Sequence, residues 1–339
     1  MSYTAGIIGC GRIGCTLDDD PLRRGVWTHA GAYRACAATE LVAAADVDAT
    51  ALARCGERWG VRRLYADYRE MLARERLDIV SVCTPSHTHA AALRAALAAG
   101  VPAIWCEKPL AASVPEALDL VAECRGRVVA VNHVRRWDKA YETARAWLAA
   151  GRAREIRAAS AWYTGGVSNI GSHLFDTLRF LLGEAAWVWA PPRDLQPGDP
   201  NVSGAIGFSS GVVCQILGCG PGDFLLFEID LVGSDGRLRI GGNGTRVEAW
   251  DMGASARYLG SRELQESKVL WEGEDGERMV AALLDIVGCL EHGGEPRCTV
   301  RDGQKAVELV GAFLSSVDER RPIALPLAGN ACDAPVPIR

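Results

Sequence analysis

A glycine-rich turn near the start of the chain has the spacing of a phosphate-binding loop. The residues Gly9-Cys10-Gly11-Arg12-Ile13-Gly14 form a GxGxxG motif directly after an apolar run at 4–8. Its glycines permit a tight turn and let backbone N–H groups approach a pyrophosphate at a helix N-terminus. Asp46 ends the second apolar run, where its carboxylate can accept hydrogen bonds from an adenosine ribose and would repel a 2′-phosphate. Together these residues predict a dinucleotide site that favours NAD over NADP.

Two polar runs follow the third and fourth apolar runs of the chain. They read Thr84-Pro85-Ser86-His87-Thr88-His89 and Glu107-Lys108-Pro109. Because ligands bind beyond the carboxyl ends of strands in open α/β sheets, we expect both runs to meet the dinucleotide. By position alone, Lys108 is equally well interpreted as a solvated strand terminus. Pro109 favours a functional role, because a restricted or cis Lys-Pro peptide would fix the direction of the lysine side chain.

A third group of polar residues lies in the second half of the chain. Asn169, His173 and Asp176 are spaced i, i+4, i+7, which places them on one stripe of a helix whose other positions supply an apolar face. Such a stripe can bind a ligand, or it can consist only of an N-cap and a hydrogen-bonded histidine.

A basic segment follows the last apolar run of the first half. It reads Asn132-His133-Val134-Arg135-Arg136, and we expect it to border a cleft between two domains. Arg135 or Arg136 could meet a carboxylate or phosphate of a substrate. An interdomain salt bridge is an equally good interpretation of these arginines.

The elements that must position these residues follow from hydrophobic periodicity. In the first 130 residues, apolar runs without polar alternation are separated by helical patterns, which predicts a doubly wound parallel sheet of the Rossmann type. The expected strands are 4–8, 41–45, 79–83, 102–106 and 127–131, and the expected helices are 28–38, 48–59, 67–75, 87–99 and 113–125. Ser113 is the expected N-cap of the last helix, since Pro115 and Glu116 follow in its first turn.

The second half of the chain has a different pattern. Glycine-rich turns separate alternating runs at 155–163, 185–190, 201–208, 211–218, 223–232, 237–241 and 245–250, and helical patterns lie at 171–182, 277–291 and 302–317. The turns at 234–236 and 241–244 are typical of hairpins, which favours antiparallel pairing. We expect an N-terminal dinucleotide-binding domain at 1–130. The expected second domain, at 131–339, is an α+β domain on a large, mostly antiparallel open sheet, for substrate binding and oligomerisation.

A loop is inserted between the phosphate turn and the next helix. Asp46 lies 32 residues after Gly14, where about 20 is typical, and the excess falls in residues 15–27. This insertion is either a plain surface loop or a lid over the cofactor or substrate.

Composition excludes several classes of protein. The chain of 339 residues has a formal net charge of −5 and no block of like charges, which argues against nucleic-acid and membrane partners. Its twelve cysteines form no CxxC pair and lie mostly in apolar runs, as expected for free thiols in a reducing cytosol, so no metal site is expected. We find no signal peptide or apolar run long enough to span a membrane, and we expect a soluble, cytoplasmic protein.

The motifs taken together resemble the Gfo/Idh/MocA family of glucose-fructose oxidoreductase and inositol dehydrogenase. The resemblance rests on the GxGxxG turn, the runs at 84–89 and 107–109, and the Gly165-Gly166 to Asp176 stretch, and it extends to about residue 183. It implies an NAD(P)-dependent dehydrogenase of a sugar, sugar nucleotide or cyclitol, and a homodimer or homotetramer joined through the second domain's sheet. By this resemblance Lys108 is the catalytic lysine and His173 the histidine of the substrate helix. Many members have aspartate where this chain has Asn169, which cannot exchange a proton as a carboxylate does.

The expected reaction is oxidation of a ring secondary alcohol with hydride transfer to nicotinamide, or the reverse ketone reduction. Lys108 would act as the base, with its pKa lowered by desolvation beside the cationic ring, and His173 would be the second proton-transfer group. The expected substrate contacts are Asn169, Asp176, Arg135 and Tyr163. The expected cofactor contacts are Gly9, Gly11, Arg12, Ile13, Gly14, Asp46, Thr84, Pro85, His87, His89, Glu107, Lys108 and Asn132. Three alternatives remain. They are a glycosidase that uses NAD for transient oxidation and elimination, a non-catalytic NAD-binding regulator, and a reductase of a non-sugar substrate such as an imine or a tetrapyrrole, which the polar helix suits poorly.

Overall fold

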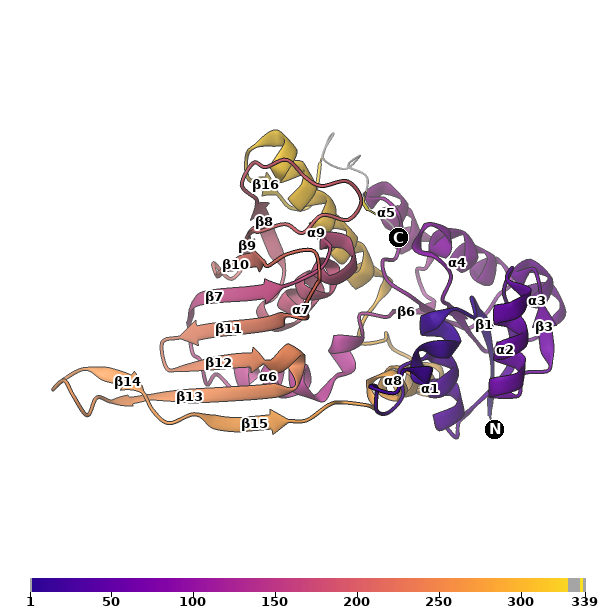
Figure 1. Ribbon diagram of the computed structural model, residues 1–339, viewed down its shortest axis with the longest axis horizontal. Helices are drawn as coiled ribbons and strands as arrows, with labels where there is room; N and C mark the ends of the chain where they lie inside the picture. Colours follow the sequence, from indigo (N-terminus) through magenta and orange to yellow (C-terminus); the bar gives the residue numbers. More distant parts are fainter. Residues whose placement is uncertain (1, 329–335, 338–339) are drawn as a thin grey trace. The chain divides into compact units, whose positions relative to one another are not determined.

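The computed structural model describes residues 2–328 and 336–337, which divide into two compact units. The first unit contains residues 2–137 and 276–307. The second contains residues 138–275, 308–328 and 336–337. Each unit has its own sheet and its own covering helices (Figure 1).

The first unit is built on a six-stranded parallel sheet with the order β3-β2-β1-β4-β5-β6. Its strands are β1 (Tyr3–Ile8), β2 (Thr39–Ala45), β3 (Arg63–Tyr65), β4 (Ile79–Val82), β5 (Ala103–Cys106) and β6 (Val128–Val131). Every residue of β4 and β5 is buried, whichever way its side chain points, so both faces of the sheet are covered. The predicted doubly wound sheet is confirmed. β3 was not predicted, because its three residues are largely exposed at the sheet edge and form no apolar run.

Helices connect and cover these strands. They are η1 (Arg12–Thr16), η2 (Leu17–Asp19), α1 (His29–Ala35), α2 (Ala49–Trp59), α3 (Tyr68–Arg74), η3 (Ser86–Thr88), α4 (His89–Ala98), α5 (Val114–Glu123), η4 (Val134–Trp137) and α8 (Arg278–His292). α1 packs against α8, whereas α3 packs on α4 and α4 on α5. α8 comes from the second half of the sequence, yet it contacts β5 and β6 of the first unit.

Side-chain caps define where several of these helices begin. The Ser113 side chain accepts a hydrogen bond from the Glu116 N–H at 3.3 Å, which confirms the predicted cap of α5. Thr28 caps α1, Asp48 caps α2 and Asp67 caps α3 in the same way.

The second unit is built on a ten-stranded mixed sheet. Its order is β14-β13-β12-β11-β7-β10-β9-β8-β16, and β15 pairs with β13. The strands are β7 (Ile156–Tyr163), β8 (Ala185–Trp189), β9 (Gly204–Phe208), β10 (Val213–Gly218), β11 (Phe227–Gly233), β12 (Gly236–Gly241), β13 (Arg246–Ala254), β14 (Arg262–Leu264), β15 (Lys268–Glu272) and β16 (Ile323–Ala324). β10 and β7 are parallel and the other pairs are antiparallel, so the predicted mostly antiparallel sheet is confirmed.

Helices and tight turns complete the second unit. Its helices are α6 (Lys139–Ala149), η5 (Val167–Gly171), α7 (Ser172–Leu182), η6 (Gly242–Gly244) and the later part of α9 (Val300–Glu319), which begins in the first unit. Both predicted hairpins form, β11–β12 and β12–β13. The short strands β14, β15 and β16 were not predicted, because they are exposed or only two residues long.

Among the described residues, no helix combines the length and the apolar character needed to cross a membrane.

Candidate active site

The glycines of the phosphate turn have different structural roles. Gly9 has a φ of +99°, and a Cβ there would lie 2.6 Å from the Cys83 backbone. A Cβ on Gly14 would overlap the Gly9 carbonyl. A Cβ on the exposed Gly11 would meet no protein atom within 4 Å. Packing therefore requires Gly9 and Gly14, whereas Gly11 leaves the backbone accessible to a ligand, as pyrophosphate binding needs.

Asp46 holds this turn from the end of β2. Its Oδ2 accepts a hydrogen bond from the Cys10 N–H at 2.6 Å, and its Oδ1 accepts one from the Asp48 N–H at 2.8 Å. Each carboxylate oxygen can accept further hydrogen bonds, since these interactions use only part of its acceptor capacity. Arg12 is exposed and Ile13 half-buried beside the turn. Asp46 is therefore fixed in position and still able to bind ribose hydroxyls.

The end of β5 carries a buried carboxylate with a complete set of donors. Glu107 Oε1 lies 3.1 Å from His29 Nε2 and accepts from Asn132 Nδ2 at 2.5 Å. Its Oε2 accepts from the Lys108 backbone N–H at 3.2 Å. Burial alone would raise the pKa of Glu107, but His29, Asn132 and Lys108 lower it overall. Glu107 is therefore an ionised group fixed directly beside the predicted catalytic lysine.

His29 links this carboxylate to a hydroxyl chain inside the sheet. His29 Nδ1 lies 2.9 Å from Ser81 Oγ, which lies 2.7 Å from the Tyr33 hydroxyl. Burial raises the pKa of Tyr33, so its hydroxyl keeps its proton. The bonding pattern then assigns donation from Tyr33 to Ser81, from Ser81 to His29 Nδ1, and from His29 Nε2 to Glu107.

His89 lies against the backbone at Pro109, the residue that follows the predicted lysine. The Lys108–Pro109 peptide is cis, as the sequence had suggested. The two ring nitrogens of the buried His89 each lie 2.7 Å from a carbonyl oxygen, one of Pro109 and one of Thr84. Burial lowers the pKa of His89, and the two carbonyls oppose this only in part. His89 therefore lies between the two polar runs instead of facing outward, and its neutral ring donates to one of the two carbonyls at a time. Pro85 and His87 are exposed.

Thr84 and Asn132 differ in how many hydrogen bonds their side chains make within the protein. The Thr84 hydroxyl oxygen is buried without a hydrogen-bond partner among the described residues. Asn132 is fully engaged, because its Oδ1 accepts from Trp105 Nε1 at 3.2 Å while its Nδ2 binds Glu107. The unpartnered hydroxyl, the open Gly11 backbone and the Asp46 carboxylate together fit a dinucleotide.

In the second unit, the predicted polar stripe runs from η5 into α7. Asn169 and His173 are half-buried, while Asp176 is buried with its Oδ1 3.7 Å from Arg179 Nη1. The turn is held by Asp199, which accepts hydrogen bonds from the N–H groups of Ser168 and Asn169 at 2.8 and 2.9 Å. The three positions are therefore helical, with Asn169 on η5 and His173 and Asp176 on α7, and their action as one binding stripe stays a prediction.

The two glycines before this stripe are required by its geometry. Gly165 has a φ of +92°. A Cβ on Gly166 would overlap the Asp199 carboxylate. The contact between Asp199 and the η5 backbone therefore depends on glycine at this position. Asp199 was not predicted from the sequence, because it lies in a proline-rich loop about 30 residues away.

Two other predicted residues, Tyr163 and Arg136, make contacts inside their own units. Tyr163 is buried, and its hydroxyl both donates to the Val202 carbonyl at 2.8 Å and accepts from the Val202 N–H at 3.0 Å. Arg136 is buried and forms an ion pair with Asp302 at 2.9 Å within the first unit. Arg135 is half-buried on η4.

The inserted segment at 15–27 is tied to the first unit. Asp18 accepts hydrogen bonds from the Trp27 N–H at 2.6 Å and the Thr28 hydroxyl at 2.5 Å. The guanidinium groups of Arg23 and Arg278 lie 4.6 and 4.1 Å from the centre of the Trp27 ring. These contacts attach the insertion to the start of α8.

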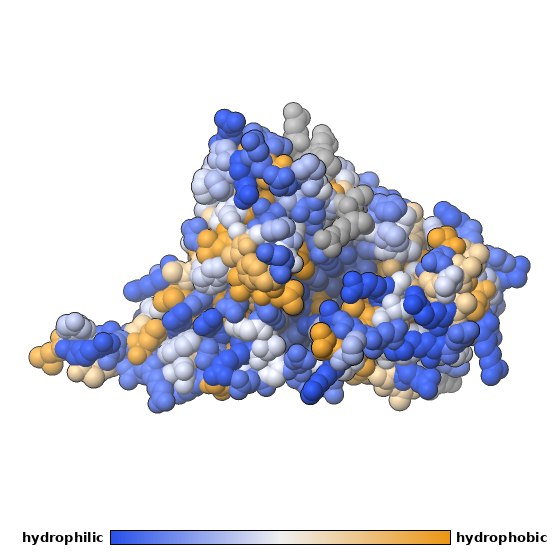
Figure 2. Space-filling model, in the orientation of Figure 1, coloured by the Kyte–Doolittle hydropathy of each residue, from blue (hydrophilic) through white to orange (hydrophobic). Residues whose placement is uncertain are grey.

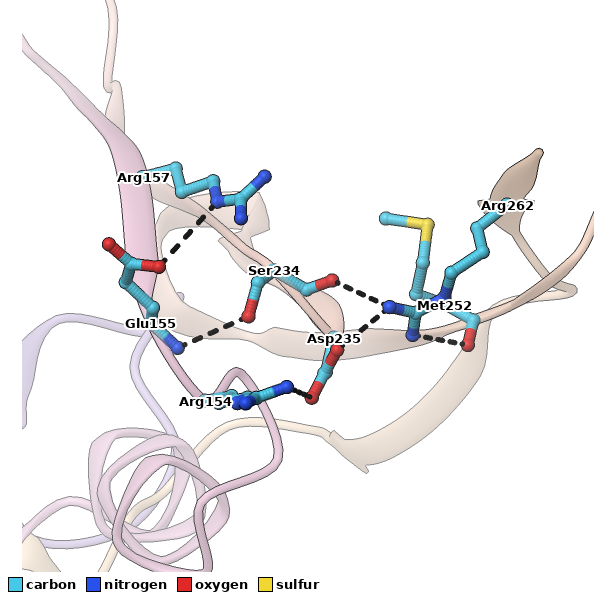
Figure 3. A pocket seen from close by; sticks show the side chains of 7 residues that line it. All are labelled: Arg154, Glu155, Arg157, Ser234, Asp235, Met252 and Arg262. Atoms are coloured by element: carbon cyan, nitrogen blue, oxygen red, sulfur yellow. Dashed lines mark hydrogen bonds and ion pairs between the residues drawn. The ribbon is translucent and has the colours of Figure 1, made fainter. Parts of the chain in front are cut away.

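A polar hollow of about 450 Å³ lies in the second unit, apart from the predicted residues. It is lined by Arg154, Glu155, Arg157, Ser234, Asp235, Met252 and Arg262 (Figure 3). Arg262 and Arg154 both reach Asp235, at 3.0 and 3.8 Å. Because its charges already pair with one another, we assign it no role.

Comparison with known proteins gives two matches that together span most of the chain. The profile described as "Oxidoreductase family, NAD-binding Rossmann fold" (GFO_IDH_MocA) matches residues 3–133. The profile described as "Oxidoreductase family, C-terminal alpha/beta domain" matches residues 126–325.

Similar proteins of known activity cover nearly the whole chain. D-apiose dehydrogenase of Paraburkholderia graminis is 28% identical over 336 residues, which are 88% of this chain and 86% of the relative. Inositol 2-dehydrogenase of Rhizobium meliloti is 24% identical over 362 residues, which are 96% of this chain and 100% of the relative.

Solved structures share the fold of this chain. Levoglucosan dehydrogenase in complex with NADH gives a TM-score of 0.82 at 18% identity, covering 97% of this chain and 100% of that structure. The WlbA dehydrogenase from Bordetella pertussis, in complex with NADH and UDP-GlcNAcA, gives a TM-score of 0.77 at 22% identity, covering 97% and 100%.

Proposed function

This chain belongs to the Gfo/Idh/MocA oxidoreductase family and is an NAD-dependent sugar or cyclitol oxidoreductase, and we propose that it acts on a secondary alcohol of its substrate or on the corresponding ketone. When bound, the nicotinamide supplies the hydride acceptor or donor. The protein must then move the hydroxyl proton and orient the substrate.

The observation that carries the proposal is the ionised Glu107 beside Lys108. Three donors fix this carboxylate: the His29 ring, the Asn132 side chain and the Lys108 backbone N–H. The backbone that carries the lysine is held again by His89 through Pro109. A proton-transfer group must be accurately placed to contribute a typical factor of about 10²–10⁴ to the rate. We assign Lys108 as the group that takes the alcohol proton in oxidation and returns it in reduction.

The residues of the second unit complete the assignment. His173 is the second proton-transfer group in this proposal, and Asn169 and Asp176 orient the hydroxyl groups of the substrate. Asn169 can donate and accept hydrogen bonds but cannot exchange a proton at neutral pH, so it positions and does not titrate. The Tyr163 hydroxyl is already hydrogen-bonded to the Val202 backbone, so we assign Tyr163 a structural role and no direct contact with the substrate. Arg135 remains the candidate for an anionic group of the substrate.

The domain roles, assembly and location form part of the same proposal. We assign residues 1–130 to dinucleotide binding and residues 131–339 to substrate binding and self-association as a homodimer or homotetramer. Apolar side chains gather over β10 and the loop after it, where Val213, Leu217, Phe224 and Leu225 are 38–83% exposed (Figure 2). The buried free cysteines favour a reducing compartment such as the cytoplasm.

The test is turnover with NAD on a panel of pentoses, hexoses, inositols and nucleotide sugars, followed by nicotinamide absorbance. With a substrate identified, Lys108→Ala should lower kcat by about 10²–10⁴ while the variant still binds NADH. Lys268→Ala, at an exposed lysine of β15, is the matched control. Near-normal kcat in Lys108→Ala would contradict the role of the lysine. A flat response to the whole panel, with NAD bound, would favour redox-neutral elimination or a regulator.

A further inference from the structure

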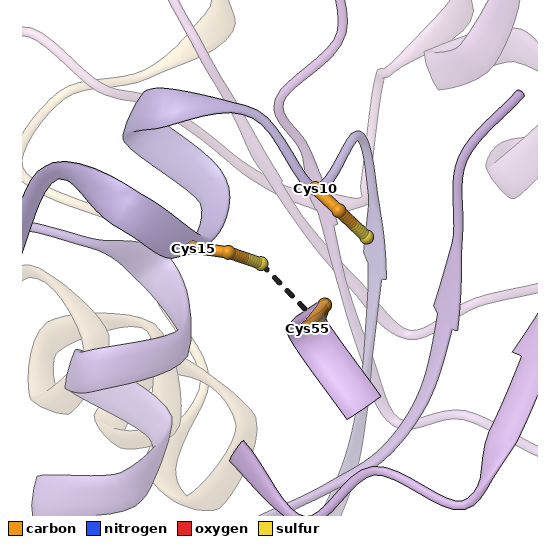
Figure 4. A group of neighbouring side chains, drawn as sticks. All are labelled: Cys10, Cys15 and Cys55. Carbon is orange, nitrogen blue, oxygen red and sulfur yellow. Dashed lines mark hydrogen bonds between the residues drawn. The ribbon is translucent and has the colours of Figure 1, made fainter. Parts of the chain in front are cut away.

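Three thiols gather directly beneath the phosphate turn. The Sγ atoms of Cys10, Cys15 and Cys55 all lie within 4.8 Å of one another. Cys10 and Cys15 belong to the turn and η1, and Cys55 reaches them from α2 (Figure 4). The Cys15 thiol donates a hydrogen bond to Cys55 Sγ at 3.3 Å. All three residues are at most 1% exposed.

Their separations fit a shared metal ion. Thiolate sulfurs bind zinc at about 2.3 Å, so three sulfurs around one ion lie about 3.8–4.0 Å apart in tetrahedral or trigonal geometry. The observed range, from 3.3 Å to at most 4.8 Å, brackets that spacing. Adjustments below an ångström in flexible side chains would bring the three sulfurs onto one ion. Sequence spacing gave no sign of this, because the three residues lie 5 and 40 positions apart and form no CxxC pair.

This arrangement is distinct from the rest of the cysteines. Most other described cysteines lie singly in the apolar core, where a thiol packs as a small hydrophobe. The group at 10, 15 and 55 is the one cluster among the described residues whose sulfur or other ligand atoms converge closely enough for a metal. A GxGxxG turn needs its glycines, but phosphate binding requires no thiol at Cys10 within the motif or at Cys15 directly after it.

We propose that Cys10, Cys15 and Cys55 bind one thiophilic metal ion of the zinc or monovalent copper class behind the phosphate turn. All-sulfur ligation selects these ions over magnesium, calcium or manganese. The ion would link the turn to α2, and so stabilise the first unit without occupying the exposed backbone at Gly11. Because the thiolate is the ligand, binding releases protons and weakens as pH falls.

The test titrates fully reduced protein with Cd²⁺, as a spectroscopic substitute for Zn²⁺, and separately with Cu⁺ under anaerobic conditions. We expect thiolate-to-metal charge-transfer absorption that saturates at one ion per chain. Cys15→Ala and Cys55→Ala should each weaken binding by at least about tenfold. Cys124→Ala, at a buried thiol elsewhere in the first unit, is the matched control and should bind as the unmodified chain does. Saturation of the charge-transfer absorption at one Cd²⁺ per chain, without such saturation by Cu⁺, would assign the site to zinc. The opposite result would assign it to copper.

Thermal unfolding supplies the second measurement. The ion should raise the Tm of the unmodified chain and of Cys124→Ala, and should not raise that of Cys15→Ala or Cys55→Ala. NADH binding by each variant shows whether it has folded, independently of turnover. Absence of charge transfer, equal binding in all variants, or formation of only a Cys15–Cys55 disulfide on exposure to air would overturn the proposal.

Discussion

The predicted proton-transfer groups of the two units are held in different ways. Beside Lys108, the carboxylate of Glu107 receives hydrogen bonds from three separate elements and lies almost entirely out of solvent. In the second unit, the turn that carries Asn169 is held at its backbone by one carboxylate, Asp199, while His173 is half-buried on α7. The first arrangement is a closed network that tolerates little change. In the second arrangement Asp199 binds backbone N–H groups, so its hydrogen bonds do not depend on which side chains the turn carries.

The largest effect on stability and turnover is expected from Glu107→Gln. The amide NH2 would face either His29 and Asn132 or the Lys108 backbone N–H, all of which already donate, so buried donors would be left unsatisfied. We expect the free energy of unfolding to fall by about 1–3 kcal/mol and kcat to fall more than tenfold. Denaturant unfolding and steady-state kinetics measure the two effects. Glu116→Gln, on the half-exposed start of α5, is the control, and equal behaviour of the two variants would refute a special role for the network.

A pair of glycine substitutions separates packing from ligand binding. In Gly166→Ala the new Cβ would overlap Asp199, so we expect a loss of about 1–3 kcal/mol in stability. In Gly11→Ala nothing in the protein is displaced, so stability should be nearly unchanged while NADH binding weakens. Calorimetry and NADH fluorescence titration distinguish the two. Normal NADH affinity in Gly11→Ala would show that the cofactor does not approach this backbone.

A smaller effect is expected from Asp199→Asn. The amide oxygen can still accept one hydrogen bond from the η5 backbone, but the second N–H group loses its charged partner. We expect a loss of about 0.5–1 kcal/mol in stability and a larger rise in KM than fall in kcat. A variant with unchanged KM would indicate that the cap supports the fold and does not position Asn169.

The smallest expected effect is on the stability of the protein at acidic pH. The folded state lowers the pKa of Glu107 below its ordinary value of 4.5, so its contribution to stability is complete above that value. The contribution is lost as pH falls from there through the lowered pKa of the folded state. Unfolding of the unmodified chain between pH 6 and pH 3 should therefore show a decline that is shallower in Glu107→Gln. Parallel curves for the two proteins would exclude Glu107 as a source of acid sensitivity.

The sequence predicted those structural features that depend on residues close together in the chain. Five of the six strands of the first sheet, the Ser113 cap, both hairpins and the cis Lys108–Pro109 peptide depend on neighbouring residues, and each is present. The parts that were missed depend on contacts between distant residues. His29 meets Ser81 and Glu107 across separations of 52 and 78 positions, and Asp199 caps a turn 30 positions before it. No periodicity or spacing marks such partners, because the fold alone brings them together.

The buried Trp105 gives the network beside Lys108 a built-in optical signal. Its ring centre lies 3.9 Å from that of His29, and its indole N–H donates to Asn132, the residue that also holds Glu107. Indole emission responds to charged groups close to the ring. A change of charge in this network should therefore alter the fluorescence of Trp105. Quenchers dissolved in the solvent cannot reach this ring, because it is fully buried.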